Sequence, residues 1–273
     1  MSKNSVEQRE STSQKPAANT WAGRIEGWIT ASNFIKFAAL GGPLTILFFF
    51  LWMPATNNLP PMAPSLSPER VRAHYMYHEK GYKGGLVLMT LASFFQPLYT
   101  AAVAGQMSRI PGVPKTAVYA QMLGGAMGGL FLCLPPYLFA ATMYRAADRA
   151  PELTQLLNDL SWIVFAMPFP ALLCQEFAFS YAILLDKRPN PLFPRWVAYT
   201  SSALTLGFWP ATGVHCVHSG AVAWNGGLAF WVAGVTGGAQ FCLISWAVFR
   251  AAMRTDLPGE NEPHPDDLST TIS

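Results

Sequence analysis

The sequence contains few charged residues. Only 12% of its 273 residues are Asp, Glu, Lys or Arg, which is about half of the ~25% that is usual in soluble proteins. So few charges cannot cover a water-exposed globular surface. Because hydrophobic residues make up 51% of the chain and aromatic residues 13%, we predict that much of the surface faces lipid and that the chain is a polytopic membrane protein.

Cysteine and familiar catalytic motifs are also scarce. The four cysteines (Cys133, Cys174, Cys216 and Cys242) are widely spaced, which excludes a disulfide-stapled scaffold. The chain has no H-E-x-x-H or C-x-x-C motif, so no known catalytic metal pattern applies. The net charge of +3 is carried by residues that bound apolar segments, and we expect no nucleic-acid partner. Whether the chain is an enzyme stays open.

Six segments are long and apolar enough to cross a bilayer as helices, which takes about 20 residues. Charged, Pro-rich or Gly-containing breaks separate them, and none shows the alternating pattern of barrel strands. We therefore predict an all-α fold with one six-helix transmembrane domain over residues 21–250. The predicted spans lie near 33–53, 84–105, 118–142, 160–185, 197–215 and 226–249.

The distribution of Lys and Arg predicts the orientation. With six spans, 12 of the 18 Lys and Arg residues fall on the side of the N-terminus and six on the other. Since cytoplasmic loops carry the excess of positive charge, both termini should be cytoplasmic, in a bacterial inner membrane. Residues 1–20 and 251–273 are then cytoplasmic tails, and the lipid bilayer is the main partner.

Two short helices are expected outside the spans. Trp21, Ile25, Trp28 and Ile29 share one helical face, so residues 21–31 should lie as a helix in the inner interface. In the long outer loop, Ser67-Pro68-Glu69 is a helix-start signal. We expect a helix over 68–80 there.

Four of the five histidines fall on the predicted outer side, in two pairs. His74 and His78 are four residues apart, and His215 and His218 are three apart, so each pair shares a helical face. Converging imidazoles bind Cu or Zn, and haem iron takes axial histidines. Interfacial histidines without a ligand are the alternative interpretation.

Glu176 is the one acidic residue predicted near the middle of the membrane. It precedes Asp186 by ten residues, about 15 Å along a helix. An intramembrane carboxylate should face the bundle interior and be paired or protonated. Gln96 and Gln240 are expected at similar depth. The three side chains predict a polar layer that binds a ligand, or that joins helices by hydrogen bonds.

Three short motifs resemble a family of bacterial six-span membrane proteins that has no characterised activity. They are Leu157-Asn158-Asp159-Leu160-Ser161-Trp162, then Phe193-Pro194-Arg195-Trp196 with Tyr199, then Ala223-Trp224-Asn225-Gly226. The resemblance covers residues from about 33 to 250. It implies the six-span layout and no mechanism.

Three classes of function stay open. In the first, the chain is an accessory subunit that associates with a membrane-protein partner or forms a homo-oligomer. In the second, it binds or transports a small molecule around Glu176, Gln96 and Gln240. The alternative is a membrane metalloprotein with Cu, Zn or haem at the outer histidines His74, His78, His215 and His218.

Overall fold

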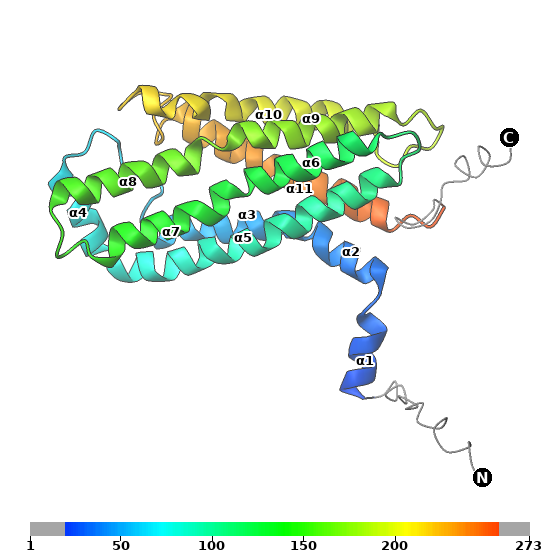
Figure 1. The fold of residues 1–273 in the computed structure, drawn as a ribbon, viewed down its shortest axis with the longest axis horizontal. Coiled ribbons are helices and arrows are strands. Elements are labelled where there is room, and N and C mark those ends of the chain that lie inside the picture. Colours follow the sequence, from blue (N-terminus) through cyan, green and yellow to red (C-terminus); the bar gives the residue numbers. More distant parts are fainter. Residues whose placement is uncertain (1–19, 257–273) are drawn as a thin grey trace, which may run out of the picture.

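The structure is a computed structural model that describes residues 20–256. Its helices form an elongated bundle (Figure 1), and no strand occurs within the described part of the chain. This confirms the all-α prediction. The two predicted tails fall almost entirely outside the described residues.

Within residues 20–256, five helical stretches are long and apolar enough to cross a membrane. They match the first four predicted spans and the sixth. The fourth stretch begins at Pro151, nine residues before the predicted start at 160. The five stretches are Ala31–Ala55, Glu79–Ser108, Lys115–Tyr144, Pro151–Leu185 and Gly227–Ala252.

Proline and glycine divide three of these stretches into two helices each. Leu40 separates the first pair, Gly129 the second, and Met167 with Pro168 the third. By contrast, α5 (Glu79–Ser108) continues through Pro97. The divided helices are α2 (Ala31–Ala39) and α3 (Gly41–Ala55), α6 (Lys115–Gly128) and α7 (Leu130–Tyr144), and α8 (Pro151–Ala166) and α9 (Phe169–Leu185).

The fifth predicted span is irregular in its second half. It begins as the α-helix α10 (Arg195–Thr205) and continues as the 3-10 helix η1 (Leu206–Cys216), which contains Pro210. It is not among the five apolar stretches. The last span also begins irregularly, with the π-helix η2 (Gly227–Val232) before α11 (Ala233–Ala252).

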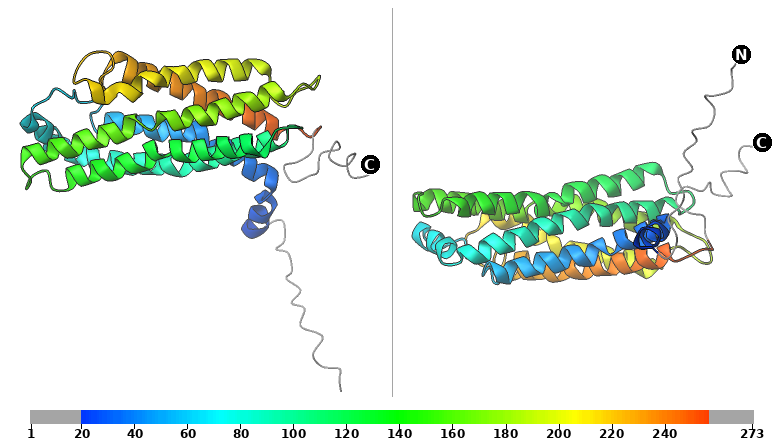
Figure 2. Two further views of the ribbon diagram at one scale, coloured as in Figure 1. Left: turned by 45° about the horizontal axis from the view of Figure 1, so that its top comes forward. Right: turned by 90° about the horizontal axis from the view of Figure 1, so that it is seen from below.

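The two short helices lie at opposite ends of the bundle (Figure 1). Helix α1 (Trp21–Trp28) begins after Thr20, whose side chain caps it, and it leaves Trp21 and Trp28 exposed. Helix α4 (Pro68–Tyr77) is capped by Ser67 and ends three residues before the predicted position 80. Figure 2 shows α1 and the end of α11 at one end of the bundle, away from α4.

The two halves of the bundle differ in their packing. In the half near α4, a cluster of aromatic rings fills the core, with Trp52 6.0 Å from Trp162 and 5.5 Å from Phe139 between ring centroids. In the other half, Ala, Val and Ile side chains of α5, α9, α10 and α11 surround the stacked rings of Tyr99 and Phe241. Polar side chains lie next to this second core.

Glycines of α6 allow α6 and α9 to approach each other closely. A Cβ atom on Gly124 would lie 2.6 Å from the backbone nitrogen of Gln175 and 2.9 Å from the carbonyl oxygen of Ala171. At Gly128 it would lie 2.3 Å from Leu172. Close packing at this small-residue motif is therefore intramolecular.

We expect Gly124→Ala to destabilise the bundle, because backbone atoms of α9 occupy the space of the added methyl group. Overpacking of this kind costs about 1–3 kcal/mol. The thermal unfolding midpoint in detergent should fall. Gly84→Ala is the control, since a Cβ there meets nothing within 4 Å, and equal midpoints for the two variants would contradict the packing.

Candidate functional site

Glu176 lies in a hydrogen-bonded network between three helices. The residue is 4% exposed, and its carboxylate accepts a hydrogen bond from Ser201 Oγ of α10 at 2.9 Å. The amide of Gln240, from α11, lies within hydrogen-bonding reach of the same carboxylate. Gln240 Nε2 also donates to Thr205 Oγ1 at 2.6 Å. The structure therefore brings together two members of the predicted polar layer, Glu176 and Gln240.

Gln96 belongs to a second polar cluster, between α5, α6 and α9. Its Nε2 atom donates to Thr100 Oγ1 at 3.1 Å and to the carbonyl oxygen of Gly125 at 2.7 Å. Gln175 Oε1 lies 2.6 Å from the position that a Cβ of Gly125 would take. No hydrogen bond in the described residues joins Gln96 to Glu176 or Gln240. The adjacent residues Gln175 and Glu176 thus serve different clusters on two faces of α9.

Ser201 and Thr205 are the site residues that the sequence prediction missed. They lie four residues apart on one face of α10, and both residues are fully buried. Ser201 Oγ donates to Glu176 of α9, whereas Thr205 Oγ1 accepts from Gln240 of α11. A pair of small hydroxyl residues at this spacing in an otherwise apolar span is a signal for an interhelical hydrogen-bonding face.

Several buried acceptors in these clusters have no hydrogen-bond partner within the described part of the chain. Gln240 Oε1 and Gln96 Oε1 are two of them, and the hydroxyl of Tyr99 is a third such group. Tyr99 lies close enough to Glu176 to interact with its charge. These two amide oxygens and the Tyr99 hydroxyl are therefore buried without a partner among residues 20–256.

The structure gives each predicted histidine pair its own neighbours. The rings of His74 and His78 lie 4.8 Å apart, and their Nε2 atoms are occupied by Thr56 O at 3.3 Å and Asn57 Nδ2 at 3.1 Å. His215 Nε2 lies 3.5 Å from Cys216 Sγ. Among residues 20–256 no group of three or more His, Cys, Asp or Glu side chains is arranged to hold a metal ion. Metal or haem binding by these histidines stays a prediction without structural support.

An apolar cavity of about 120 Å³ lies in the half of the bundle near α4. Side chains of α3, α9, η1, η2 and α11 contribute to its wall, together with α7 and α8. Thr45 contributes a hydroxyl that is fully buried and has no hydrogen-bond partner in the described chain. The wall includes Phe49, Met53, Phe131, Phe165, Phe169, Leu172, Phe208, Trp224, Ala229, Phe230, Gly237 and Phe241.

The cavity reaches the exposed surface of the bundle. Phe50, Trp231 and Val235 line it and are 41%, 45% and 69% exposed. The π-helix η2 provides Ala229, Phe230 and Trp231. Because a π-helical turn displaces side chains from their α-helical positions, such turns often occur at functional sites.

The buried position of His74 predicts a dependence of stability on pH. Burial lowers the pKa of His74 from 6.5 to about 4, and the nearby His78 makes a smaller contribution in the same direction. The unfolded chain therefore takes up a proton as the pH falls below about 6.5, while the folded chain stays neutral until about pH 4. Stability should fall over this window.

We expect the thermal unfolding midpoint in detergent to drop between pH 7 and pH 5, and to drop less in His74→Gln. The exposed His218 provides the control, because His218→Gln should keep the wild-type response. An unchanged pH response in His74→Gln would contradict the role of His74.

Comparison of the chain with protein-family models, with curated proteins and with solved structures gave no match.

Proposed function

We propose that this chain is a six-span protein of the bacterial inner membrane, with both termini cytoplasmic, that binds a small, mainly apolar molecule from the bilayer. The observation that carries the proposal is the aromatic-lined cavity with exposed residues at its rim.

The combined length of α10 and η1 supports a membrane crossing by the fifth predicted span, which brings the number of crossings to six. Eleven α-helical and eleven 3-10 residues extend over about 38 Å. This exceeds the ~30 Å hydrocarbon core. With this crossing, the chain begins and ends on the same side of the membrane, as the distribution of Lys and Arg favours.

The size of the cavity limits what it holds. Sites for drug-sized ligands measure about 300–1,000 Å³, whereas an apolar cavity of about 150 Å³ stays dry and binds benzene. About 120 Å³ therefore suits a ring or a segment of an acyl chain.

The polar clusters support a structural role for Glu176. Its partners Ser201 and Gln240 come from the neighbouring helices α10 and α11, as expected for interhelical hydrogen bonds. Ligand binding by Glu176, Gln96 and Gln240 stays a separate prediction. The accessory-subunit role also stays a prediction, because lipid covers exposed apolar helix faces as well as a partner protein does.

The topology is tested by cysteine labelling. In a chain whose four native cysteines are replaced by alanine, we expect Ser219→Cys to react with a membrane-impermeant maleimide in spheroplasts. Lys187→Cys should react only after the membrane is permeabilised. Because the two positions flank α10 and η1, equal labelling of both would show that this segment does not cross.

The cavity is tested with bromobenzene as the probe, because bromine quenches tryptophan fluorescence and Trp224 and Trp231 line the cavity. We expect wild-type protein in detergent to show a saturable component of quenching. Gly234 also lines the cavity, and a Cβ there meets nothing within 4 Å, so Gly234→Leu should remove the saturable component by filling the space.

Gly84→Leu is the matched control, since Gly84 is equally open but lies outside the cavity. Its tryptophan fluorescence should show the same saturable quenching by bromobenzene as the wild type. Quenching that rises linearly with bromobenzene in the wild type, without saturation, would contradict the proposed binding.

A further inference from the structure

A second, polar pocket lies at the end of the bundle where α11 ends. Its volume is about 460 Å³, and its wall includes Asn190 and Leu192 from the loop between α9 and α10. Trp246 and Arg250 of α11 contribute to it, as do Arg254 and Asp256 just beyond the helix. In the proposed topology this pocket faces the inner leaflet and the cytoplasm.

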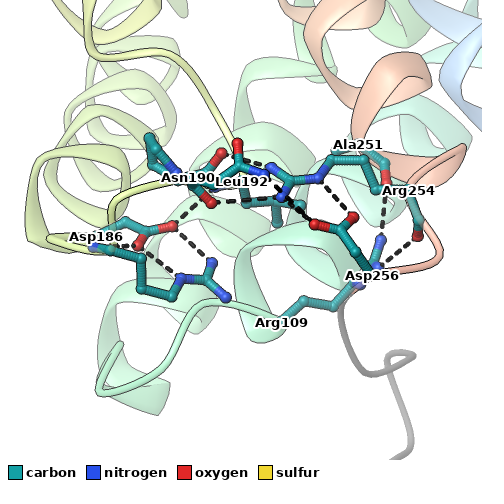
Figure 3. Close-up of polar contacts among 9 residues, drawn as sticks. Arg109, Asp186, Asn190, Leu192, Ala251, Arg254 and Asp256 are labelled. Atoms are coloured by element: carbon teal, nitrogen blue, oxygen red, sulfur yellow. Dashed lines mark hydrogen bonds and ion pairs between the residues drawn. The ribbon is translucent and has the colours of Figure 1, made fainter.

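Hydrogen bonds and ion pairs fix the walls of this pocket (Figure 3). Arg254 donates to the carbonyl oxygen of Pro191 at 2.6 Å and to Asp256 Oδ1 at 3.0 Å. Arg109, at the end of α5, donates to the carbonyl oxygens of Ala251 at 2.8 Å and Arg254 at 3.1 Å. The end of α11 is therefore held to α5 and to the loop after α9.

The loop itself is held by Asp186. Arg188 forms an ion pair with its carboxylate at 2.7 Å, and the backbone N–H of Leu192 donates to it at 2.9 Å. Burial raises the pKa of Asp186, but these hydrogen bonds outweigh burial and lower it below its ordinary value. The carboxylate therefore stays charged at neutral pH and keeps the wall in place.

Arg250 lines the pocket but takes no part in this network of hydrogen bonds and ion pairs. Its guanidinium lies 5.2 Å from the centre of the Trp246 ring, and Trp246 lies 5.6 Å from Trp196 of α10. No carboxylate of the described chain forms a salt bridge with Arg250. Because Arg254 pairs with Asp256, the positive charge of Arg250 is the one left for a ligand.

The two tryptophans indicate where such a ligand comes from. Trp196 and Trp246 are 49% and 41% exposed, and tryptophan rings at a membrane interface sit at the level of the lipid headgroups. Tyr199 continues the exposed face of α10 into the bilayer. Arginine close to the cytoplasmic leaflet attracts anionic lipids.

We propose that this pocket binds the phosphate of an anionic phospholipid of the inner leaflet, with Arg250 as its cationic contact and the acyl chains along Trp196 and Tyr199. The proposal rests on the proposed topology for the choice of leaflet. It does not involve the apolar cavity, which lies in the other half of the bundle.

The test measures lipid retention by native mass spectrometry of the full chain in detergent, with equimolar phosphatidylglycerol and phosphatidylcholine. We expect the wild type to retain phosphatidylglycerol preferentially. Because one basic residue near the surface contributes about fivefold to the attraction of anionic lipid, Arg250→Gln should reduce this preference about fivefold.

Arg145→Gln is the matched control. Arg145 lies over the Tyr144 ring at 5.8 Å, so it is also an arginine on an aromatic ring, but at the opposite end of the bundle. It should keep the wild-type preference. Equal retention of the two lipids by the wild type, or equal losses in Arg145→Gln and Arg250→Gln, would overturn the proposal.

A competition experiment distinguishes binding of a lipid from binding of a soluble anion. Excess inorganic phosphate should leave phosphatidylglycerol bound, because it lacks the acyl chains; displacement by phosphate would overturn the assignment to lipid. Failure of the proposed topology appears instead as labelling of Lys187→Cys from outside, which is a different measurement. Unfolding midpoints of the variants confirm that each is folded.

Discussion

A polar group buried among membrane-spanning helices has no water to bond with, so the protein itself must supply its partner. Helices meet this requirement for the backbone. For side chains, it makes the position of one helix depend on another: Glu176 of α9 needs Ser201 of α10, and Gln96 of α5 needs the carbonyl oxygen of Gly125 in α6. Threonines satisfy the requirement locally, as Thr205 does by donating to the carbonyl oxygen of Ser201. The arrangement of α5, α6, α9, α10 and α11 follows from these pairings.

Features that depend on a short stretch of sequence were predictable. Apolar runs with charged ends predicted the five long helical stretches, and Ser67-Pro68-Glu69 predicted the start of α4. The 3-10 geometry of η1 was not predictable, because Pro210 shows that an α-helical hydrogen bond is lost but not which pattern replaces it. The π-helical start of the last span was not predictable either, because Asn225-Gly226 indicates only where a helix begins and not which hydrogen-bond pattern it adopts.

The candidate sites depend on how each helix is rotated about its axis. The position of a residue in the sequence predicts only its depth within the bundle, and not the neighbour that its side chain faces. Depth placed Gln96 together with Glu176 and Gln240, whereas rotation directs Gln96 toward Gly125 and Gln240 toward Thr205. The histidines show the same limit, since spacing predicted that His74 and His78 share a face but could not bring His215 to them. The apolar cavity is lined by side chains from seven helical elements, so no single segment of the sequence predicts it.

The two faces of α9 limit how this molecule can move. Its glycine-lined contact with α6 and the Gln175 side chain lie on one side, and Glu176 is bonded to α10 on the other. Turning α9 about its own axis would break both sets of contacts together, so the position of α9 is tied to those of α6 and α10. The cavity is lined instead by mainly apolar residues of α3, η2 and the start of α11, so a rearrangement that admits a guest molecule would involve these elements.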